Sequence, residues 1–232
     1  MASSRRLFAA GIICTAVCLG SGHQIVPSAL AQSAKPPAPT ASQVQVDLLR
    51  GLADIFSRGM DTLTDKLNRQ GYSARVYSTN GWQSVAQRIA GQYSRGQKTI
   101  VVVIGHSLGA NATFQIANTL NAQNIPIELI VTFDATSPLP VPKNVLHFVN
   151  FYQNNGFGKK VSPAPDFKGE LSNIDLTADS SLSHTTIEKS PRLHALVMQK
   201  IADIVDKDLA NKIASTKPKS KKPKTAPQSV KQ

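Results

Sequence analysis

The stretch TIVVVIGHSLG, residues 99–109, decides the fold of this 232-residue chain. Its first six residues form the continuous apolar run that is typical of a strand buried on both faces of a parallel sheet. The Gly-His-Ser-Leu-Gly turn that follows leads directly into a helix-like segment over residues 108–120. A serine at such a junction occupies a strained turn that lifts its hydroxyl above the sheet. Gly105 and Gly109 add no side chains where strand and helix approach each other.

Outward from this stretch, strand and helix patterns alternate along the chain. The helical segments are predicted at 61–70, at 82–93 and from Pro191 onward, with Ser190 as the N-cap of the last helix. The other strands are predicted at 44–49, 74–77, 127–133, 145–151 and 171–176. Such alternation favours an α/β fold, in which a mostly parallel central sheet carries helices on both faces.

Three short segments, at residues 104–110, 132–135 and 183–186, resemble the α/β-hydrolase superfamily, particularly its small lipases and esterases. The resemblance covers most of residues 44–208 and implies the α/β-hydrolase fold, with a catalytic Ser, then an acid, then a His in chain order. Only ten residues separate Asp134 from the strand that begins at Val145. We therefore expect a minimal cap domain or none.

Ser107 is the candidate nucleophile, and it needs a base to accept its proton. Five histidines are present. His184 lies in the loop after the last predicted strand, where this superfamily presents its base, and it is favoured over His194 in the final helix. His147 lies within a strand, and His106 is the variable residue of the elbow, with its side chain expected to point away from Ser107.

Asp134 is the candidate acid that would orient the imidazole and stabilise its cation. It follows the strand 127–133, at the sheet edge where ligands bind in open α/β folds. Most members of the superfamily carry the acid one strand later, where this chain has only Gln and Asn at 153–155. Asp175 and Asp179 are the alternatives.

Two backbone N–H groups are needed to stabilise an oxyanion. One is expected from Leu108, directly after the nucleophile. The resemblance implies that the other comes from the loop after the first strand, from Leu52 or, as the second choice, Gly51. The sequence contains no His/Asp/Glu cluster with metal-ligand spacing and no Gly-rich phosphate loop, so we expect no cofactor and no metal.

The net charge of +12 is concentrated at the two ends of the chain. Residues 1–31 carry two arginines, residues 211–232 carry seven lysines, and neither segment contains an acidic residue. The stretch between them holds 17 basic and 14 acidic residues and is nearly balanced. A nucleic-acid partner is therefore not expected.

The N-terminus has the three parts of a cleavable signal peptide, predicted over residues 1–31. Arg5 and Arg6 precede an apolar stretch at 7–20, which is too short to span a bilayer, and small residues follow at 29–31. This predicts export to the periplasm or the medium, through the twin-arginine or the general route, with a retained anchor as the alternative. Both cysteines of the chain lie within this segment.

The remaining segments are a flexible leader at 32–43, an α/β-hydrolase domain at 44–210 and a disordered Lys/Pro-rich tail at 211–232, which could contact an anionic envelope. The sequence thus predicts an exported serine hydrolase that cleaves small-molecule or lipid carboxylic esters through an acyl-enzyme. A thioesterase with the same triad is one alternative. The other is a non-catalytic protein of this fold that binds an envelope polymer through its tail.

Overall fold

The computed structural model describes residues 43–52 and 57–216, and these residues lie in one compact unit. The predicted signal peptide, nearly all of the predicted leader and residues 217–232 of the predicted tail lie outside the described residues.

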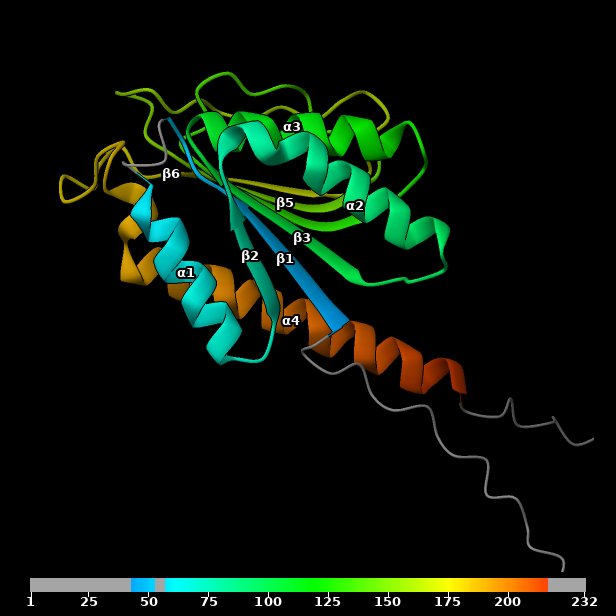
Figure 1. Ribbon diagram of the computed structural model, residues 1–232. Helices are drawn as coiled ribbons and strands as arrows, with labels where there is room; N and C mark the ends of the chain where they lie inside the picture. The colour runs from blue at the N-terminus through cyan, green and yellow to red at the C-terminus, as the bar shows by residue number, and fades with distance from the viewer. Residues whose placement is uncertain (1–42, 53–56, 217–232) are drawn as a thin grey trace, which may run out of the picture. The chain divides into compact units, whose positions relative to one another are not determined.

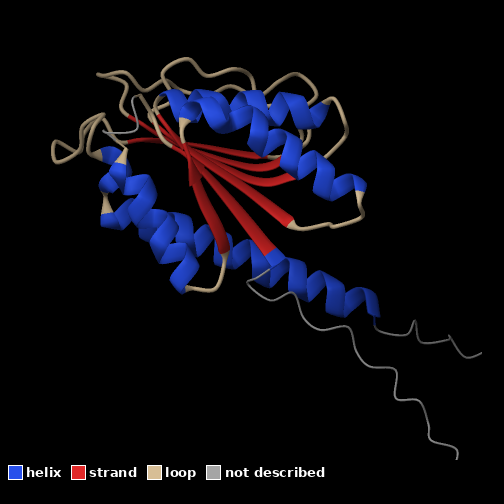
Figure 2. Cartoon of the chain, in the orientation of Figure 1, coloured by secondary structure: helices blue, strands red, loops and turns tan. Residues whose placement is uncertain are grey.

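The centre of the fold is a sheet of six strands that all run parallel (Figures 1 and 2). The spatial order is β2-β1-β3-β4-β5-β6. This confirms the predicted α/β fold, and every predicted strand is present with its ends shifted by two residues at most. The strands are β1 (Val44–Leu49), β2 (Ser73–Tyr77), β3 (Ile100–His106), β4 (Ile127–Phe133), β5 (Val145–Tyr152) and β6 (Glu170–Asp175).

Helices cover both faces of the sheet, as predicted. On one face lie α2 (Trp82–Ser94) and α3 (Leu108–Asn121), and on the other lie α1 (Arg58–Arg69) and α4 (Pro191–Thr216) (Figure 1). Two short 3₁₀ helices, η2 (Thr79–Gly81) and η3 (Ile187–Lys189), are also present. Residues 134–169 contain no helix.

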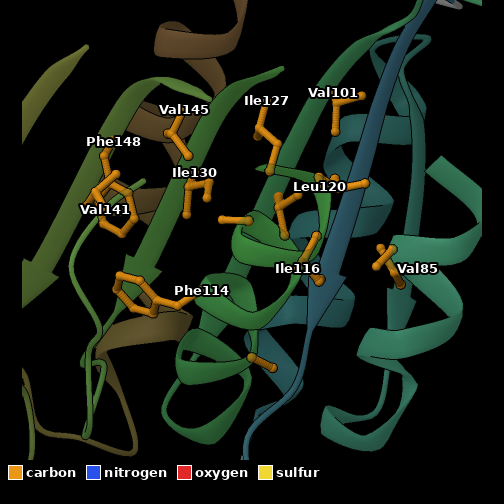
Figure 3. Close-up of a cluster of buried hydrophobic side chains, with 14 of the residues drawn as sticks. Val85, Val101, Phe114, Ile116, Leu120, Ile127, Ile130, Val141, Val145 and Phe148 are labelled. Carbon is orange, nitrogen blue, oxygen red and sulfur yellow. The ribbon is translucent and has the colours of Figure 1, made fainter. Parts of the chain in front are cut away.

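The alternating side chains of the strands build one apolar core on each face. In β3, Val101 and Val103 face α2 and α3, whereas Val102 and Ile104 face α1 and α4. Figure 3 shows the first of these cores, in which side chains of α3 lie against β3, β4 and β5. Each fully buried side chain of this size contributes about 1.5–3 kcal/mol to the free energy of unfolding. Because both faces of β3 are buried in this way, its sequence is an unbroken apolar run.

The strand register brings the ends of the central strands to one edge. Leu49 at the end of β1 pairs with Gly105, and His106 at the end of β3 pairs with Phe133, which in turn pairs with Phe151 of β5. Parallel strands end on the same side of a sheet, so the residues that follow each of them meet there. That edge carries every residue that the sequence analysis selected as catalytic.

Candidate active site

Ser107 stands at the sharp turn between β3 and α3, with backbone angles φ 57° and ψ −119°. Positive φ is costly for a residue with a side chain. The Ser107 N–H donates to the Phe133 carbonyl at 3.0 Å, which ties the turn to β4. In the described chain only two other non-glycine residues have positive φ, Asn124 and Asp134. Two of these three strained positions therefore belong to the same site.

The two glycines of the turn are required by close backbone contacts. A Cβ at Gly105 would lie 2.4 Å from the Gly109 carbonyl oxygen, and a Cβ at Gly109 would lie 2.4 Å from the carbonyl oxygens of Leu49 and Arg50. Any side chain would push α3 away from the ends of β1 and β3. The short distance between strand and helix places the start of α3 directly beside Ser107.

His184 reaches Ser107 from a turn that precedes η3. Its Nε2 lies 2.9 Å from Ser107 Oγ, and its Nδ1 lies 3.2 Å from Asp134 Oδ2. A carboxylate only accepts hydrogen bonds, so Nδ1 carries the proton and Nε2 is left to accept one from the serine hydroxyl. The turn is closed by bonds from the Thr186 and Ile187 N–H groups to the Ser183 carbonyl, at 3.0 and 2.8 Å.

Asp134 is fully buried, and both of its oxygens have partners. Oδ2 faces His184, while Oδ1 accepts the Gln153 N–H at 2.8 Å. Gln153 stands where most of the superfamily carry the acid, and here its backbone supports Asp134 instead. The structure thus brings Ser107, His184 and Asp134 into one continuous line.

The alternative acids lie apart from this line. Asp175 is exposed and accepts hydrogen bonds from the N–H and hydroxyl of Thr177. Asp179 accepts from Ser181 and pairs with Arg192 at 3.0 Å. Neither carboxylate contacts a histidine among the described residues.

The loop after β1 lies beside the nucleophile, and one of its two candidate oxyanion donors is already engaged. The Gly51 N–H donates to Ser57 Oγ at 2.7 Å. Leu52 lines the same cavity as Ser107 and is 63% exposed. The Gly51 N–H is therefore occupied by Ser57, and Leu52 is the predicted donor from this loop that does not bond Ser57. Leu108 opens α3, and the first N–H groups of a helix have no partner within it.

Three other histidines are described, and none of them contacts Ser107 Oγ. His147 bonds Glu170 Oε2 at 3.0 Å on the sheet face that α4 covers in part. His194 is buried, and its Nε2 donates to the Glu188 carbonyl at 2.7 Å.

His106 lies much closer to the site than the sequence analysis expected. Its Nδ1 is 2.8 Å from Ser57 Oγ and its Nε2 is 2.8 Å from the carbonyl oxygen of His184. The rings of His106 and His184 are 5.0 Å apart. No pattern in the sequence points to these partners, because they lie 49 and 78 residues away along the chain.

A cavity of about 340 Å³ opens above Ser107, at the low end of the size range for small-molecule sites. Most of its surface is apolar, and it contains two of the most exposed large apolar side chains, Leu52 and Phe157. The Phe157 ring lies 4.8 Å from the His184 ring. Its lining consists of Leu52, Ser57, His106, Ser107, Leu108, Thr136, Phe157, His184 and Thr185.

Within ranges 43–52 and 57–216, no group of three or more His, Cys, Asp or Glu side chains is placed to hold a metal ion. Likewise, none of the helices described is both long enough and apolar enough to cross a membrane.

Glu188 holds the loop of His184 against the start of α1. Its side chain is fully buried, and a Cβ at Gly59 would lie 2.1 Å from the Glu188 carbonyl oxygen. Burial raises the pKa of Glu188 to about 7, although the Lys189 ammonium 3.8 Å away and the N–H groups of Gly59 and Met60 oppose this rise. The carboxyl group thus lies at the N-terminus of α1, and its interactions there do not fully offset the cost of burying its negative charge.

We predict that Glu188→Gln stabilises the protein at pH 8 and has little effect at pH 5. A folded-state pKa above the usual 4.5 means that the folded protein holds a proton which the unfolded chain loses, so stability falls as the pH rises from about 4.5 to 7. Removing the charge should gain about 1–3 kcal/mol at pH 8, measured by urea unfolding.

Glu170→Gln is the matched control for this prediction. Glu170 is exposed, and the nearby Lys200 ammonium lowers the pKa of its carboxyl. Its replacement should cost a few tenths of a kcal/mol at pH 8, as for other exposed ion pairs. An equal change in stability at both pH values for Glu188→Gln would contradict the prediction.

The sheet order, the strained turn at Ser107 and the Ser-His-Asp arrangement define an α/β protein with a candidate active site at the ends of its strands. A family model of the thioesterase domain matches residues 51–147, a range that contains Ser107 and Asp134 and ends before His184. The all-parallel sheet of six strands with helices on both faces is consistent with the α/β-hydrolase fold that the resemblance implied. No curated protein matches the chain significantly.

Several solved structures are similar to this chain at low sequence identity. A hydrolase of the α/β superfamily from Xanthomonas campestris pv. campestris is 17% identical and covers 68% of this chain and 99% of its own, with a TM-score of 0.37. An esterase domain from a Rhodothermus marinus protein is 12% identical, with 70% and 89% covered and a TM-score of 0.42. A cutinase-like protein from Cryptococcus sp. is 13% identical, with 65% and 92% covered and a TM-score of 0.36.

Proposed function

We propose that this protein is an exported serine hydrolase that cleaves carboxylic esters through an acyl-enzyme. The observation that carries the proposal is the unbroken line from Ser107 Oγ through His184 to Asp134, with distances of 2.9 and 3.2 Å. A serine hydroxyl becomes a competent nucleophile only when a base accepts its proton, and this line supplies that base.

In the first half of the proposed reaction, Ser107 Oγ attacks the ester carbonyl carbon while its proton passes to His184 Nε2. The resulting imidazolium is stabilised by the buried Asp134 carboxylate. The C–O bond to the alcohol then breaks, and the alcohol leaves with the proton from His184. Ser107 is now acylated.

Water completes the second half of the cycle. His184 accepts a proton from the water, whose oxygen attacks the acyl carbon, and the bond to Ser107 Oγ breaks as the serine regains its proton. The products are a carboxylic acid and free enzyme.

In both halves the carbonyl oxygen becomes negatively charged. We assign its stabilisation to the N–H groups of Leu108 and Leu52. Leu108 lies at the N-terminus of α3, where the free N–H groups and the helix dipole favour negative charge. A lost donor of this kind typically costs about 3–4 kcal/mol of transition-state stabilisation.

A thioesterase is the second candidate, because the matched family model describes a thioesterase domain. The same serine, base and acid would serve a thioester without change. The predicted export makes an intracellular acyl-carrier substrate a poor fit, so we place the carboxylic ester first.

A fluorophosphonate probe tests whether the site reacts as proposed. The probe should label Ser107 of the full-length protein and leave Ser107→Ala unlabelled, and the label should be found in the exported fraction of the producing cells. No labelling of the wild type would overturn the serine mechanism and favour a binding protein. Labelling confined to the cytosol would contradict export alone.

The size of the cavity leads to a prediction about the acyl chain. Each methylene that enters an apolar pocket adds about 0.8 kcal/mol, or roughly fourfold in kcat/KM, until the pocket is full. Since the cavity holds about 340 Å³ and residues 134–169 contain no helix that could extend it, we expect nitrophenyl esters of short to medium chains to be the best substrates. A preference for palmitate, or a rate jump when the substrate forms an emulsion, would contradict this.

The same ester series can show which residue forms the acyl wall. Phe157→Ala should lower kcat/KM about tenfold more for the hexanoate than for the acetate, because the ring is a large exposed apolar part of the cavity lining and a longer chain buries more surface against it. Leu196→Ala is the matched control, since Leu196 is also an exposed apolar residue but lies on α4 and does not line the cavity.

A further inference from the structure

A buried chain of hydrogen bonds runs beside the proposed catalytic line. The Gly51 N–H lies 2.7 Å from Ser57 Oγ, Ser57 Oγ lies 2.8 Å from His106 Nδ1, and His106 Nε2 lies 2.8 Å from the His184 carbonyl oxygen. Gly51, Ser57 and His106 are all buried. The chain therefore crosses from the loop after β1 to the loop that carries His184.

The direction of each hydrogen bond in this chain is fixed. A carbonyl oxygen can only accept, so His106 Nε2 carries the hydrogen that it shares with His184. Burial lowers the pKa of His106 to about 4, which keeps the imidazole neutral near pH 7 and leaves Nδ1 as an acceptor. The Ser57 hydroxyl must then donate to Nδ1, while its oxygen accepts the Gly51 N–H.

This chain of hydrogen bonds connects three parts of the site: the loop after β1, the end of β3 and the loop that carries His184. At one end is the loop that offers the Leu52 N–H, one residue after Gly51. At the other end is the backbone of His184 itself. The middle member, His106, directly precedes Ser107 on β3, so its own backbone position is set by the central strand.

From this arrangement we infer that His106 is a positioning residue, whose neutral ring sets the distance between the oxyanion loop, Ser107 and His184. This inference rests on the proposed hydrolase function. His106 does not touch the reacting atoms, and its effect passes through the His184 carbonyl and through Ser57. Displacements of about 1 Å in such a constellation can cost about a hundredfold in rate.

His194 provides a matched control for the inference. It is also a buried histidine whose Nε2 donates to a backbone carbonyl, that of Glu188 at 2.7 Å. Its Nδ1 faces Lys66 Nζ at 3.1 Å, and it has no bond to Ser57 or to His184. A purely structural effect of deleting a buried imidazole should thus be similar in both positions.

The test compares His106→Leu and His194→Leu on a soluble short-chain ester, well below the melting temperature of each variant, with active sites counted by fluorophosphonate titration. For His106→Leu we expect kcat per active site to fall about 10- to 100-fold, with KM changed less than about threefold. For His194→Leu we expect a lower melting temperature and an unchanged kcat. Equal changes of kcat in the two variants, or none in either, would overturn the inference.

Two further variants keep the test decisive if His106→Leu does not fold. His106→Gln retains a donor near the position of Nε2 but has no acceptor in place of Nδ1, so it should recover only part of the lost kcat. Ser57→Ala breaks the chain at its other link, and its effect should not add to that of His106→Gln in the double variant. Full additivity of the two losses would contradict a single connected chain. A wild type that neither turns over esters nor takes the probe would instead overturn the proposed function.

Discussion

Ser107→Ala and His184→Ala are each expected to remove nearly all ester turnover, with losses in kcat on the order of 10⁶-fold, as for the Ser and His of a well-studied serine protease. In the proposed reaction Ser107 supplies the attacking oxygen, and His184 Nε2, 2.9 Å away, takes its proton. Neither substitution creates a large cavity, so the fold should remain. Steady-state kinetics and circular dichroism of the purified variants measure the two effects.

The double variant gives the sharper check, because residues that act as a unit are not additive. Ser107→Ala with His184→Ala should be scarcely slower than either single variant. His194→Ala serves as the control and should keep its turnover, since its imidazole bonds Glu188 and Lys66 and not Ser107. Wild-type turnover in His184→Ala, with a large loss in His194→Ala, would move the base to His194.

Asp134→Asn should lower kcat by about 10⁴-fold while keeping the shape of the side chain. The Asp134 carboxylate accepts hydrogen bonds from both the Gln153 N–H and His184 Nδ1. An amide group in its place can present a donor to Nδ1, which favours the wrong imidazole tautomer, and it supplies no charge to stabilise the imidazolium. Kinetics at saturating substrate measure the loss.

Two other carboxylates provide controls for the acid. Asp175→Asn and Asp179→Asn should each retain most of the wild-type activity. The exposed Asp175 bonds Thr177, the half-buried Asp179 bonds Ser181 and Arg192, and neither bonds a histidine. A loss below about tenfold in Asp134→Asn, together with a large loss in either control, would place the acid elsewhere.

The parts of the fold that depend on local pattern could be predicted from the sequence. The apolar run of β3 and the alternating strands around it are recognisable because each side chain is committed to one of two cores. The start of α1 could not be predicted in this way. The predicted helix began at Asp61, whereas the helix in the structure begins at Arg58. Helix propensity argues against Gly59, but the close approach of Glu188 to α1 requires a glycine there.

The candidate site, too, could be predicted only in part from the sequence. Ser107, Asp134 and His184 could be selected because each stands at a recognisable place relative to a strand, and the structure brings the three together; their catalytic roles stay predictions. The hydrogen bonds of His106 could not be predicted. Its partners, Ser57 and the carbonyl of His184, become neighbours only after β1, β3 and the loop before η3 have assembled, and hydrogen bonds to a backbone carbonyl leave no mark in a sequence.

The loop after β5 restricts how the substrate range of the proposed hydrolase can evolve or be engineered. Its first residue, Gln153, holds the acid through its N–H, and a Cβ at Gly158 would lie 2.1 Å from Asp134 Oδ1. Phe157, immediately beside that glycine, forms part of the pocket wall. Insertions, deletions or new backbone shapes between residues 153 and 158 would therefore change selectivity only by disturbing the acid. Exchanges of the side chain at position 157 leave that support intact, so libraries for new acyl groups belong there and not in the length of the loop.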